Sequence, residues 1–221
     1  MNPRDLFDAA GALFLDFDGP IAALMPPPVN EEAAAVARRA AQTVDLPIEI
    51  ATTADHLAVL RWVRLNCPDE VLGRVEAACT KVELEAAQSC DESPDAAILF
   101  DYAINRGIPL AIVSNNAEAA VRRFLDRRNW GNRITTLACR TSETVDSLKP
   151  SPQLLLDASD AVGVPPARAL FVGDSVSDVH AGRDAGIPVL GIAKHQRRSN
   201  DLLEAGAEAV VERGTVNQIL R

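Results

Sequence analysis

The stretch Ala12-Leu13-Phe14-Leu15-Asp16-Phe17-Asp18-Gly19 decides the fold of this chain. Its apolar half predicts a buried strand, and Gly19 breaks the pattern. Two carboxylates, Asp16 and Asp18, therefore stand where a strand runs out into a loop. In an open α/β sheet, ligands bind at this carboxyl edge. Buried carboxylates repel each other and lose hydration, so the pair predicts a bound cation. The alternative is a solvated, Asp-rich turn.

Apolar runs recur along the chain and predict further strands at residues 109–114, 134–138, 169–173, 189–192 and 209–211. They are separated by predicted helices at about residues 116–128, 151–162 and 176–185. Continuous apolar runs are typical of parallel strands that are covered on both faces. The alternation of strands and helices indicates βαβ units. We therefore expect an α/β fold, with a Rossmann-like parallel sheet core and helices on both faces.

A helical insertion interrupts this alternation after the first strand. Helical spacing of apolar residues predicts three helices within it, at residues 30–44, 53–66 and 68–88. We expect residues 1–20 and 94–221 to form the core, and residues 21–93 to form a small all-helical cap. The insertion leaves the chain just after Asp18, so it should lie above the carboxyl edge of the sheet. Breakers flank it, which predicts hinges near residues 20–28 and 89–94 and a mobile cap.

Composition narrows the class of partner. The chain has 221 residues, is 48% hydrophobic and carries a net charge of −9, so a packed core is expected and a nucleic-acid partner is not. A small phosphorylated metabolite fits, because a local cluster and a metal can override net charge. No apolar run approaches the roughly 18 residues of a membrane span, and the N-terminus has no signal pattern. The four cysteines form no CxxC pair. We expect reduced thiols in a cytoplasmic protein without membrane contact.

Two more polar sites follow predicted strands or precede helices. Ser114-Asn115-Asn116 ends the second predicted strand, where a hydroxyl, an amide and a helix N-terminus can donate to phosphoryl oxygens. Simple helix capping is the alternative. Lys149 stands just before Pro150 and a predicted helix. Its ammonium could neutralise a phosphoryl group and separate two nearby acids; a solvated lysine is the alternative.

The last polar site follows the strand at residues 169–173. Asp174 and Asp178 lie four residues apart, so they share one face if a helix starts at once. Carboxylate oxygens suit Mg²⁺, whereas an acidic helix cap is the alternative. All four sites fall at carboxyl ends of predicted parallel strands or in the loops after them. Together they offer a nucleophile, an acid/base, a phosphate cradle, a cation and a metal site.

With these motifs the chain resembles the haloacid dehalogenase superfamily of hydrolases, and its phosphoglycolate-phosphatase-like branch with a helical cap. The four family motifs are matched by Asp16-Phe17-Asp18-Gly19, Ser114-Asn115, Lys149, and Gly173-Asp174-Ser175-Val176-Ser177-Asp178. The resemblance covers about residues 10–20 and 94–213. Pro20 departs from it, since the family usually has Thr or Val after the first-motif glycine. The cap matches nothing that names a substrate.

The resemblance implies a role for each core residue. Asp16 would attack phosphorus to form an aspartyl phosphate, and Asp18 would protonate the leaving alcohol and then activate water. Mg²⁺ would bind Asp16, the backbone carbonyl of Asp18 and Asp174, with Asp178 assisting through water. The transferring phosphoryl group would be held by Ser114, Asn115 and Lys149. The result would be a Mg²⁺-dependent phosphatase acting on a small phosphomonoester.

Alternatives within and outside the family stay open. A sugar-phosphate mutase uses the same four motifs, and a non-catalytic binding or regulatory module could use the same fold. A dehalogenase would lack Asp18 as second acid, and a phosphonatase would need a cap lysine, for which only Lys81 is present. In the cap, His56, Arg61 and Arg64 are candidates for a second anionic group on the substrate. The alternative for these three residues is a solvated helix face.

Overall fold

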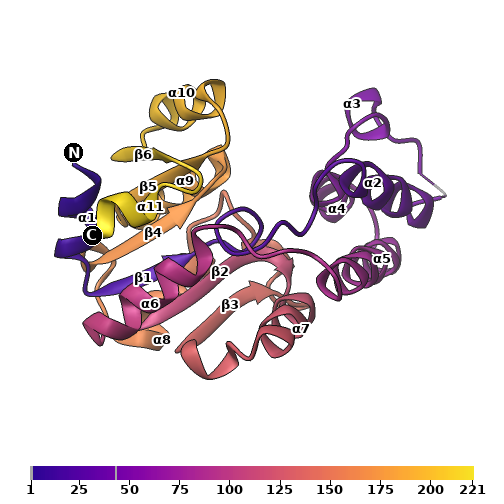
Figure 1. The fold of residues 1–221 in the computed structure, drawn as a ribbon. Coiled ribbons are helices and arrows are strands. Elements are labelled where there is room, and N and C mark those ends of the chain that lie inside the picture. Colours follow the sequence, from indigo (N-terminus) through magenta and orange to yellow (C-terminus); the bar gives the residue numbers. More distant parts are fainter. Residues whose placement is uncertain (1, 43) are drawn as a thin grey trace.

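The protein is built on one six-stranded sheet, and the computed structural model describes residues 2–42 and 44–221 (Figure 1). The strand order is β3-β2-β1-β4-β5-β6, and all pairings are parallel. The bounds are β1 Ala12–Leu15, β2 Leu110–Ala117, β3 Thr136–Arg140, β4 Ala169–Gly173, β5 Val189–Ala193 and β6 Ala209–Glu212. Every predicted strand is confirmed, although β2 runs on to Ala117 and β3 to Arg140.

Helices cover both faces of the sheet, as the apolar strands require. The bounds are α1 Pro3–Ala9, α6 Ala96–Arg106, α7 Glu118–Arg128, α8 Gln153–Val162, α9 Val176–Ala185, α10 Gln196–Ala205 and α11 Val216–Leu220. Leu13 and Leu15 of β1 face the core that α1, α6, α7 and α11 complete. Ala12 and Phe14 face the opposite core, with α8, α9 and α10. The α/β fold expected from the sequence is thus the observed one.

Among the described residues, four helices lie between β1 and the rest of the core. They are α2 Val29–Ala40, α3 Ile48–Ala51, α4 His56–Asn66 and α5 Asp69–Ala87. The predicted helix at 30–44 ends early, at Ala40, and residue 43 falls outside the described residues. The short α3 is not predicted, because it buries no residue and therefore has no apolar pattern. Among the described residues of 21–93 there is no strand; Ala22 forms only isolated bridges to Asp18 and Glu92.

The cap is joined to the core by two chain segments that run side by side. The Ser93 N–H donates to the Ile21 carbonyl at 2.8 Å, and the Ala23 N–H donates to the Asp91 carbonyl at 2.9 Å. Both crossings therefore lie at one place, next to Asp18. The division between core and cap and its mobility stay predictions. In the described ranges, no helix has the length and apolarity needed to cross a bilayer.

Candidate active site

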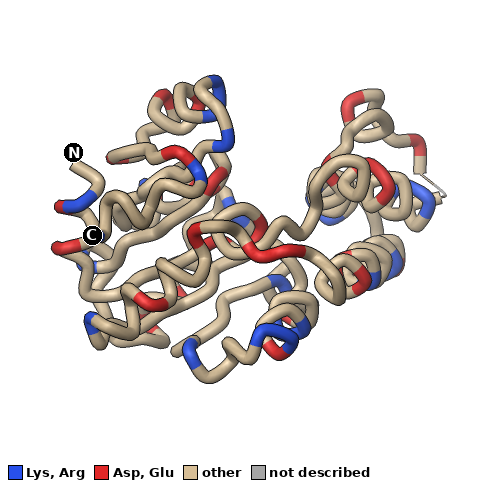
Figure 2. Tube along the Cα trace, in the orientation of Figure 1, with Lys and Arg blue, Asp and Glu red and all other residues tan. Residues whose placement is uncertain are grey.

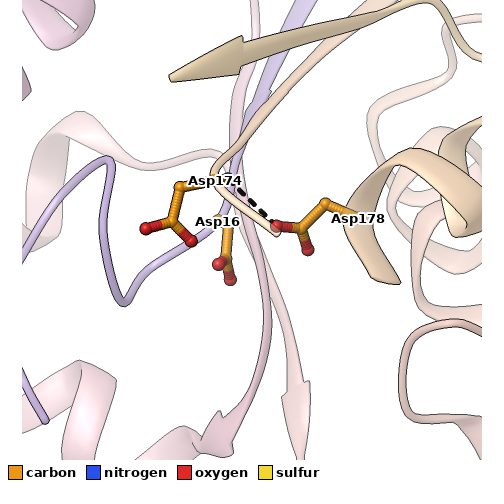
Figure 3. Close-up of side chains that lie close together, drawn as sticks. All are labelled: Asp16, Asp174 and Asp178. Atoms are coloured by element: carbon orange, nitrogen blue, oxygen red, sulfur yellow. Dashed lines mark hydrogen bonds between the residues drawn. The ribbon is translucent and has the colours of Figure 1, made fainter. Parts of the chain in front are cut away.

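Three carboxylates meet at the carboxyl edge of the two central strands. Asp16 directly follows β1, Asp174 directly follows β4, and Asp178 lies in the first turn of α9. Because Leu15 pairs with Val172, the two strands end at the same level. One oxygen from each of the three acids lies within 4.8 Å of the others (Figure 3). This spacing is compact enough for all three acids to act on one ion or one substrate group.

Two glycines let these carboxylates approach the backbone. Gly19 has φ +126°, and a Cβ there would stand 2.3 Å from Asp174 Oδ2. Gly173 has an ordinary φ, but its Cβ would stand 2.6 Å from the Cβ of Asp178. Real Cβ atoms do not approach other atoms so closely. The glycine in each motif is therefore required by the position of an acid, in addition to any need for a turn.

Lys149 lies buried between two of the acids. Its Nζ is 2.7 Å from Asp16 Oδ1 and 2.7 Å from Asp178 Oδ1, and it donates to the Val113 carbonyl at 3.0 Å. Burial alone would lower the pKa of Lys149, but the two carboxylates hold that pKa above its ordinary value. The ammonium therefore stays charged and separates the acids, as the sequence predicts.

Asn115 fixes the backbone of Lys149. Its Oδ1 accepts from the Lys149 N–H at 2.7 Å, and its Nδ2 donates to the Lys149 carbonyl at 2.9 Å. Both ends of the amide are used in this way. The observed role of Asn115 is thus to orient the lysine. The Nδ2 group carries a second hydrogen, so the predicted donation from this amide to a phosphoryl group is compatible with both bonds.

Asp178 has partners on both carboxylate oxygens. While Oδ1 faces Lys149, Oδ2 accepts from the N–H groups of Asp174 at 3.1 Å and Ser175 at 3.0 Å, and from Ser175 Oγ at 2.7 Å. The dashed line in Figure 3 marks the bond from Asp174. Asp178 therefore orders the loop after β4. Because both of its oxygens already have partners, Asp178 is less free than Asp16 and Asp174 to bind a metal directly. This agrees with the predicted role of Asp178, which is to assist metal binding through water.

Burial and mutual repulsion make it unfavourable for all of these carboxylates to be charged at once. Burial, followed by the charge of Asp178, raises the pKa of Asp16 to about 8. Burial and the same neighbour raise the pKa of Asp174 to about 6, against the opposing effect of Lys194, whose Nζ is 3.5 Å away. Such a site gains from a further cation, because a cation restores the charged form of each acid. An all-oxygen donor set of this kind fits Mg²⁺.

Asp18 differs from Asp16 in its surroundings. Burial raises its pKa, although Oδ1 accepts a hydrogen bond from the Leu24 N–H at 2.9 Å. Asp18 also has a more exposed side chain than Asp16, since it borders the cap linker rather than the sheet. A carboxyl group held partly neutral can deliver a proton, whereas one paired with an ammonium can act as a nucleophile.

The cap reaches the second motif through a buried acid that the sequence does not single out. Glu83 of α5 accepts from the Ala117 N–H at 2.7 Å and from Asn116 Nδ2 at 3.3 Å. Asn116 Oδ1 in turn accepts from Ser114 Oγ at 3.1 Å. Glu83 also pairs with the fully buried Arg140 at the end of β3. Burial would raise the pKa of Glu83, but its hydrogen bond to His56 and its partner Arg140 lower it overall.

A cavity of about 300 Å³ joins the core acids to the cap. Among the predicted site residues it is lined by Asp16, Asp18, His56, Arg61, Ser114, Asn115, Lys149, Asp174 and Asp178. Cap residues that the sequence does not indicate, notably Asn30 and Asp55, also line it. The structure therefore brings nearly all of the predicted site together.

Arg64 does not line this cavity. It forms an ion pair with Asp146 of the core, with its Nη2 at 2.5 Å from Asp146 Oδ2, and its Nη1 is 3.5 Å from Asp69 Oδ1. These partners draw the guanidinium away from the site, even though Arg61 and Arg64 are neighbours on the same helix. Arg64 links cap to core, and it does not lie with Arg61 in the lining of the cavity. Along the described part of the chain, Lys and Arg positions occur in both the core and the cap (Figure 2).

Comparison with known proteins identifies the family to which the chain belongs. The family model of haloacid dehalogenase-like hydrolases matches residues 53–192, more than half of the chain. That range holds Ser114, Lys149, Asp174 and Asp178 and begins after the first motif. The chain is 36% identical to phosphoglycolate phosphatase of Pseudomonas putida over 87 residues, 39% of this chain and 31% of that relative.

Other relatives and solved structures agree. The chain is 34% identical to N-acetylmuramic acid 6-phosphate phosphatase of Pseudomonas aeruginosa over 80 residues, 36% of this chain and 34% of that relative. It thus spans about a third of the length of these curated relatives. A hydrolase from Pseudomonas syringae superposes with a TM-score of 0.72 at 20% identity, covering 94% of this chain and 97% of its own. CbbY from Rhodobacter sphaeroides, solved with phosphate, gives 0.68 at 19%, covering 91% and 93%. Both share the fold.

Proposed function

Because this chain belongs to the haloacid dehalogenase-like hydrolase family, we propose that it is a Mg²⁺-dependent phosphatase. Its substrate would be a small phosphorylated metabolite, hydrolysed through an aspartyl-phosphate intermediate. One observation carries the proposal: Asp16 lies 2.7 Å from the buried ammonium of Lys149, at the floor of a cavity that Asp18 also lines. A nucleophile, a cation and a proton donor therefore face the same space.

The first step uses Asp16 as nucleophile. Its carboxylate attacks phosphorus, the bond from phosphorus to the leaving oxygen breaks, and that oxygen takes the proton of Asp18. Lys149 offsets charge on the phosphoryl group without moving, because Asn115 holds its backbone and Asp178 holds its ammonium. Fixed cations of this kind lower the barrier by stabilising charge that develops in the transition state, because they need no reorganisation at the moment of reaction.

The second step returns the enzyme to its starting state. Asp18, now a carboxylate, takes a proton from water, and the water oxygen attacks phosphorus. The bond from phosphorus to Asp16 breaks, which releases inorganic phosphate and restores the nucleophile. Burial raises the pKa of Asp18, which favours its role as the group that gives up and regains a proton in the two halves of this cycle.

The acid cluster supports a metal role. Mg²⁺ would be held by Asp16, the Asp18 carbonyl and Asp174, with Asp178 through water, and would neutralise charge between the two anionic reactants. The relatives named above are both phosphatases, which supports the same activity here. All four cysteines are unpaired, which supports a reducing, cytoplasmic setting.

An aryl phosphate tests the proposal directly. The purified protein should release inorganic phosphate with Mg²⁺, lose this activity in EDTA and regain it when Mg²⁺ is returned. Full turnover in thoroughly chelated enzyme would remove the metal role. With a sugar phosphate as substrate, release of inorganic phosphate, instead of an isomerised sugar phosphate, separates a hydrolase from a mutase.

A further inference from the structure

The loop after β5 brings a second lysine to the acids of the site. Lys194 directly follows β5, just as Asp174 directly follows β4, and the two strands pair in parallel with Gly191 beside Gly173. The ends of both strands therefore lie at the same edge of the sheet. Lys194 Nζ is 3.5 Å from Asp174 Oδ2, and among the described residues Asp174 is its only ion-pair partner. No motif in the sequence indicates this contact.

The two ammonium groups near the acids are held very differently. The side chain of Lys149 is 2% exposed and lies 2.7 Å from each of two carboxylates. The side chain of Lys194 is 53% exposed, and its distance to Asp174 exceeds that of an ordinary N–H···O hydrogen bond. An exposed ion pair of this kind is weak, so its lysine can change partners at small cost. Lys149 is thus a fixed charge, and Lys194 is a movable one.

The charge of Lys194 acts on two acids of the site. Burial, followed by the charge of Asp178, raises the pKa of Asp174, and Lys194 opposes this rise. Burial also raises the pKa of Asp18, again against the charge of Lys194. In the metal-free protein the ammonium therefore offsets part of the charge that would attract Mg²⁺. A metal ion on Asp174 would in turn weaken the attraction of that carboxylate for Lys194.

A substrate would bring Lys194 its next partner. One oxygen of Asp174 lies within 4.8 Å of one oxygen of Asp16 (Figure 3). A phosphoryl group attacked by Asp16 would therefore lie beside Asp174, within reach of a movement of the Lys194 side chain. Phosphoryl oxygens are anionic and accept charge-assisted hydrogen bonds from ammonium groups. The incoming phosphate would thus replace the carboxylate as the partner of this lysine.

We propose, resting on the phosphatase function above, that Lys194 changes partners when substrate binds. It pairs with Asp174 in the metal-free protein, and with the phosphoryl oxygens of the substrate when Mg²⁺ is bound to Asp174. Lys194 is then a substrate-binding residue of the core that opposes the binding of metal alone. It also strengthens the binding of a phosphorylated ligand to the metal-loaded protein. The exchange therefore makes the binding of metal and phosphate more cooperative.

Two calorimetric titrations test this exchange. Mg²⁺ is titrated into the free protein, and inorganic phosphate is titrated into the protein with saturating Mg²⁺. K194M should lower the Kd of Mg²⁺ by roughly 3- to 10-fold, because a competing charge is removed, and should raise the Kd of phosphate by a similar factor. K194R keeps the charge and should leave both values within about twofold. Opposite shifts of the two constants are expected because one charge serves both partners.

Lys81 provides the control for these titrations. It is 77% exposed and lies 3.9 Å from Glu85 on the cap, so K81M removes a similar surface charge and should leave both constants unchanged. An unchanged Kd of Mg²⁺ in K194M, an unchanged Kd of phosphate, or a shift of both in the same direction would overturn the role of Lys194. Neither titration requires turnover. These outcomes are therefore distinct from a failure to hydrolyse an aryl phosphate with Mg²⁺, which would overturn the phosphatase function itself.

Discussion

Glu83 Oε2 lies 2.6 Å from Arg140 Nη2, and neither side chain has any solvent exposure. The pair joins α5 of the cap to the end of β3 in the core, next to the second motif. Arg140 also donates from Nε to the Asn115 carbonyl at 3.1 Å and pairs with Glu76 at 2.6 Å. The cap is therefore tied to the same backbone that positions Lys149. Any cap motion has to keep or break this buried pair.

Removing one partner of this pair should cost stability. E83Q leaves Arg140 with less compensation in a buried place, and we expect a loss of about 3 kcal/mol in the free energy of unfolding. The pKa of Glu83 is lowered in the folded protein, so its stabilising effect is complete above the ordinary value of 4.5 and is lost as pH falls. The difference in the free energy of unfolding between E83Q and the unchanged protein should thus be smaller at pH 3 than at neutral pH. Urea unfolding at the two pH values measures this difference.

Glu85 provides the control for this experiment. It lies on the same helix, is well exposed and is 3.9 Å from Lys81. E85Q should change stability by less than about 0.5 kcal/mol. The double variant E83Q/R140M should lose less than the sum of its single variants, since neither charge of the fully buried pair is left without the other; Glu76, which also loses Arg140, is partly exposed to solvent. Strict additivity would contradict the coupling.

The two acids of the first motif should be separable in kinetics. D16N removes the nucleophile and should abolish both turnover and the phosphoenzyme. D18N leaves attack possible but impairs both proton transfers. Each change should lower kcat on the order of 10²-fold or more. Acid quench with a labelled substrate measures the phosphoenzyme, and near-normal turnover by D16N would refute the mechanism.

Stability in the absence of metal should depend on pH. The raised pKa values of Asp16 and Asp174 mean that the stability they contribute is complete below the ordinary value of 3.8. It is lost as pH rises through about 6 and about 8. In EDTA, the Tm of the unchanged protein should therefore fall between pH 5 and pH 8.5. The Tm of D16N should fall by less over the same range.

Mg²⁺ should oppose this loss. It would stabilise by about 2.7 kcal/mol at 100 times its Kd. At one fixed concentration its effect on Tm should be larger at pH 8.5 than at pH 5, since protons compete for the same carboxylates. Thermal scans measure both values. D174N should remove most of the gain, and an equal gain at both pH values would speak against binding at this cluster.

Gly19 should be essential for metal binding and catalysis because a side chain there has no room, whereas Gly107 has open space around it. A Cβ at Gly19 would overlap the Asp174 carboxylate, so G19A should displace that acid and lower Mg²⁺ affinity and kcat together. Gly107 also has positive φ, at +63°, but a Cβ there would meet nothing within 4 Å. G107A should cost only about 1 kcal/mol of stability and leave kcat unchanged. Titration of Mg²⁺ by calorimetry separates the two, and unaltered affinity in G19A would refute the steric account.

The two cap arginines should behave differently. R61A opens the cavity wall and frees Asp55, so KM for the phosphorylated metabolite that the protein hydrolyses best should rise by several-fold, with a smaller change for an aryl phosphate. R64A removes a contact with Asp146 outside the cavity and should leave both KM values within about twofold. Steady-state kinetics on both substrates measures this. Equal effects of the two variants would place Arg64 in the site after all.

Much of the site follows from the sequence alone. Asp16, Lys149 and Asp174 each stand at a strand end or helix start that local patterns reveal. Parallel strands place such ends at one edge of the sheet, so their meeting could be predicted without coordinates. The sheet itself is predictable for the same reason, since its strands are continuous apolar runs. α10 is harder to predict, because Leu202 is its only buried residue and its apolar face is narrow.

Only the tertiary structure decided which side chains pair across the cap and core. Glu83 and Arg140 are 57 residues apart, and each is an ordinary charged residue in its own segment. Arg61 and Arg64 share one helix and one chemistry, yet one lines the cavity and the other binds Asp146. Local patterns determine the periodicity of burial, which selects strands, helices and their ends. The partner of a charged side chain depends on how two distant elements cross, and no spacing within either element records that crossing.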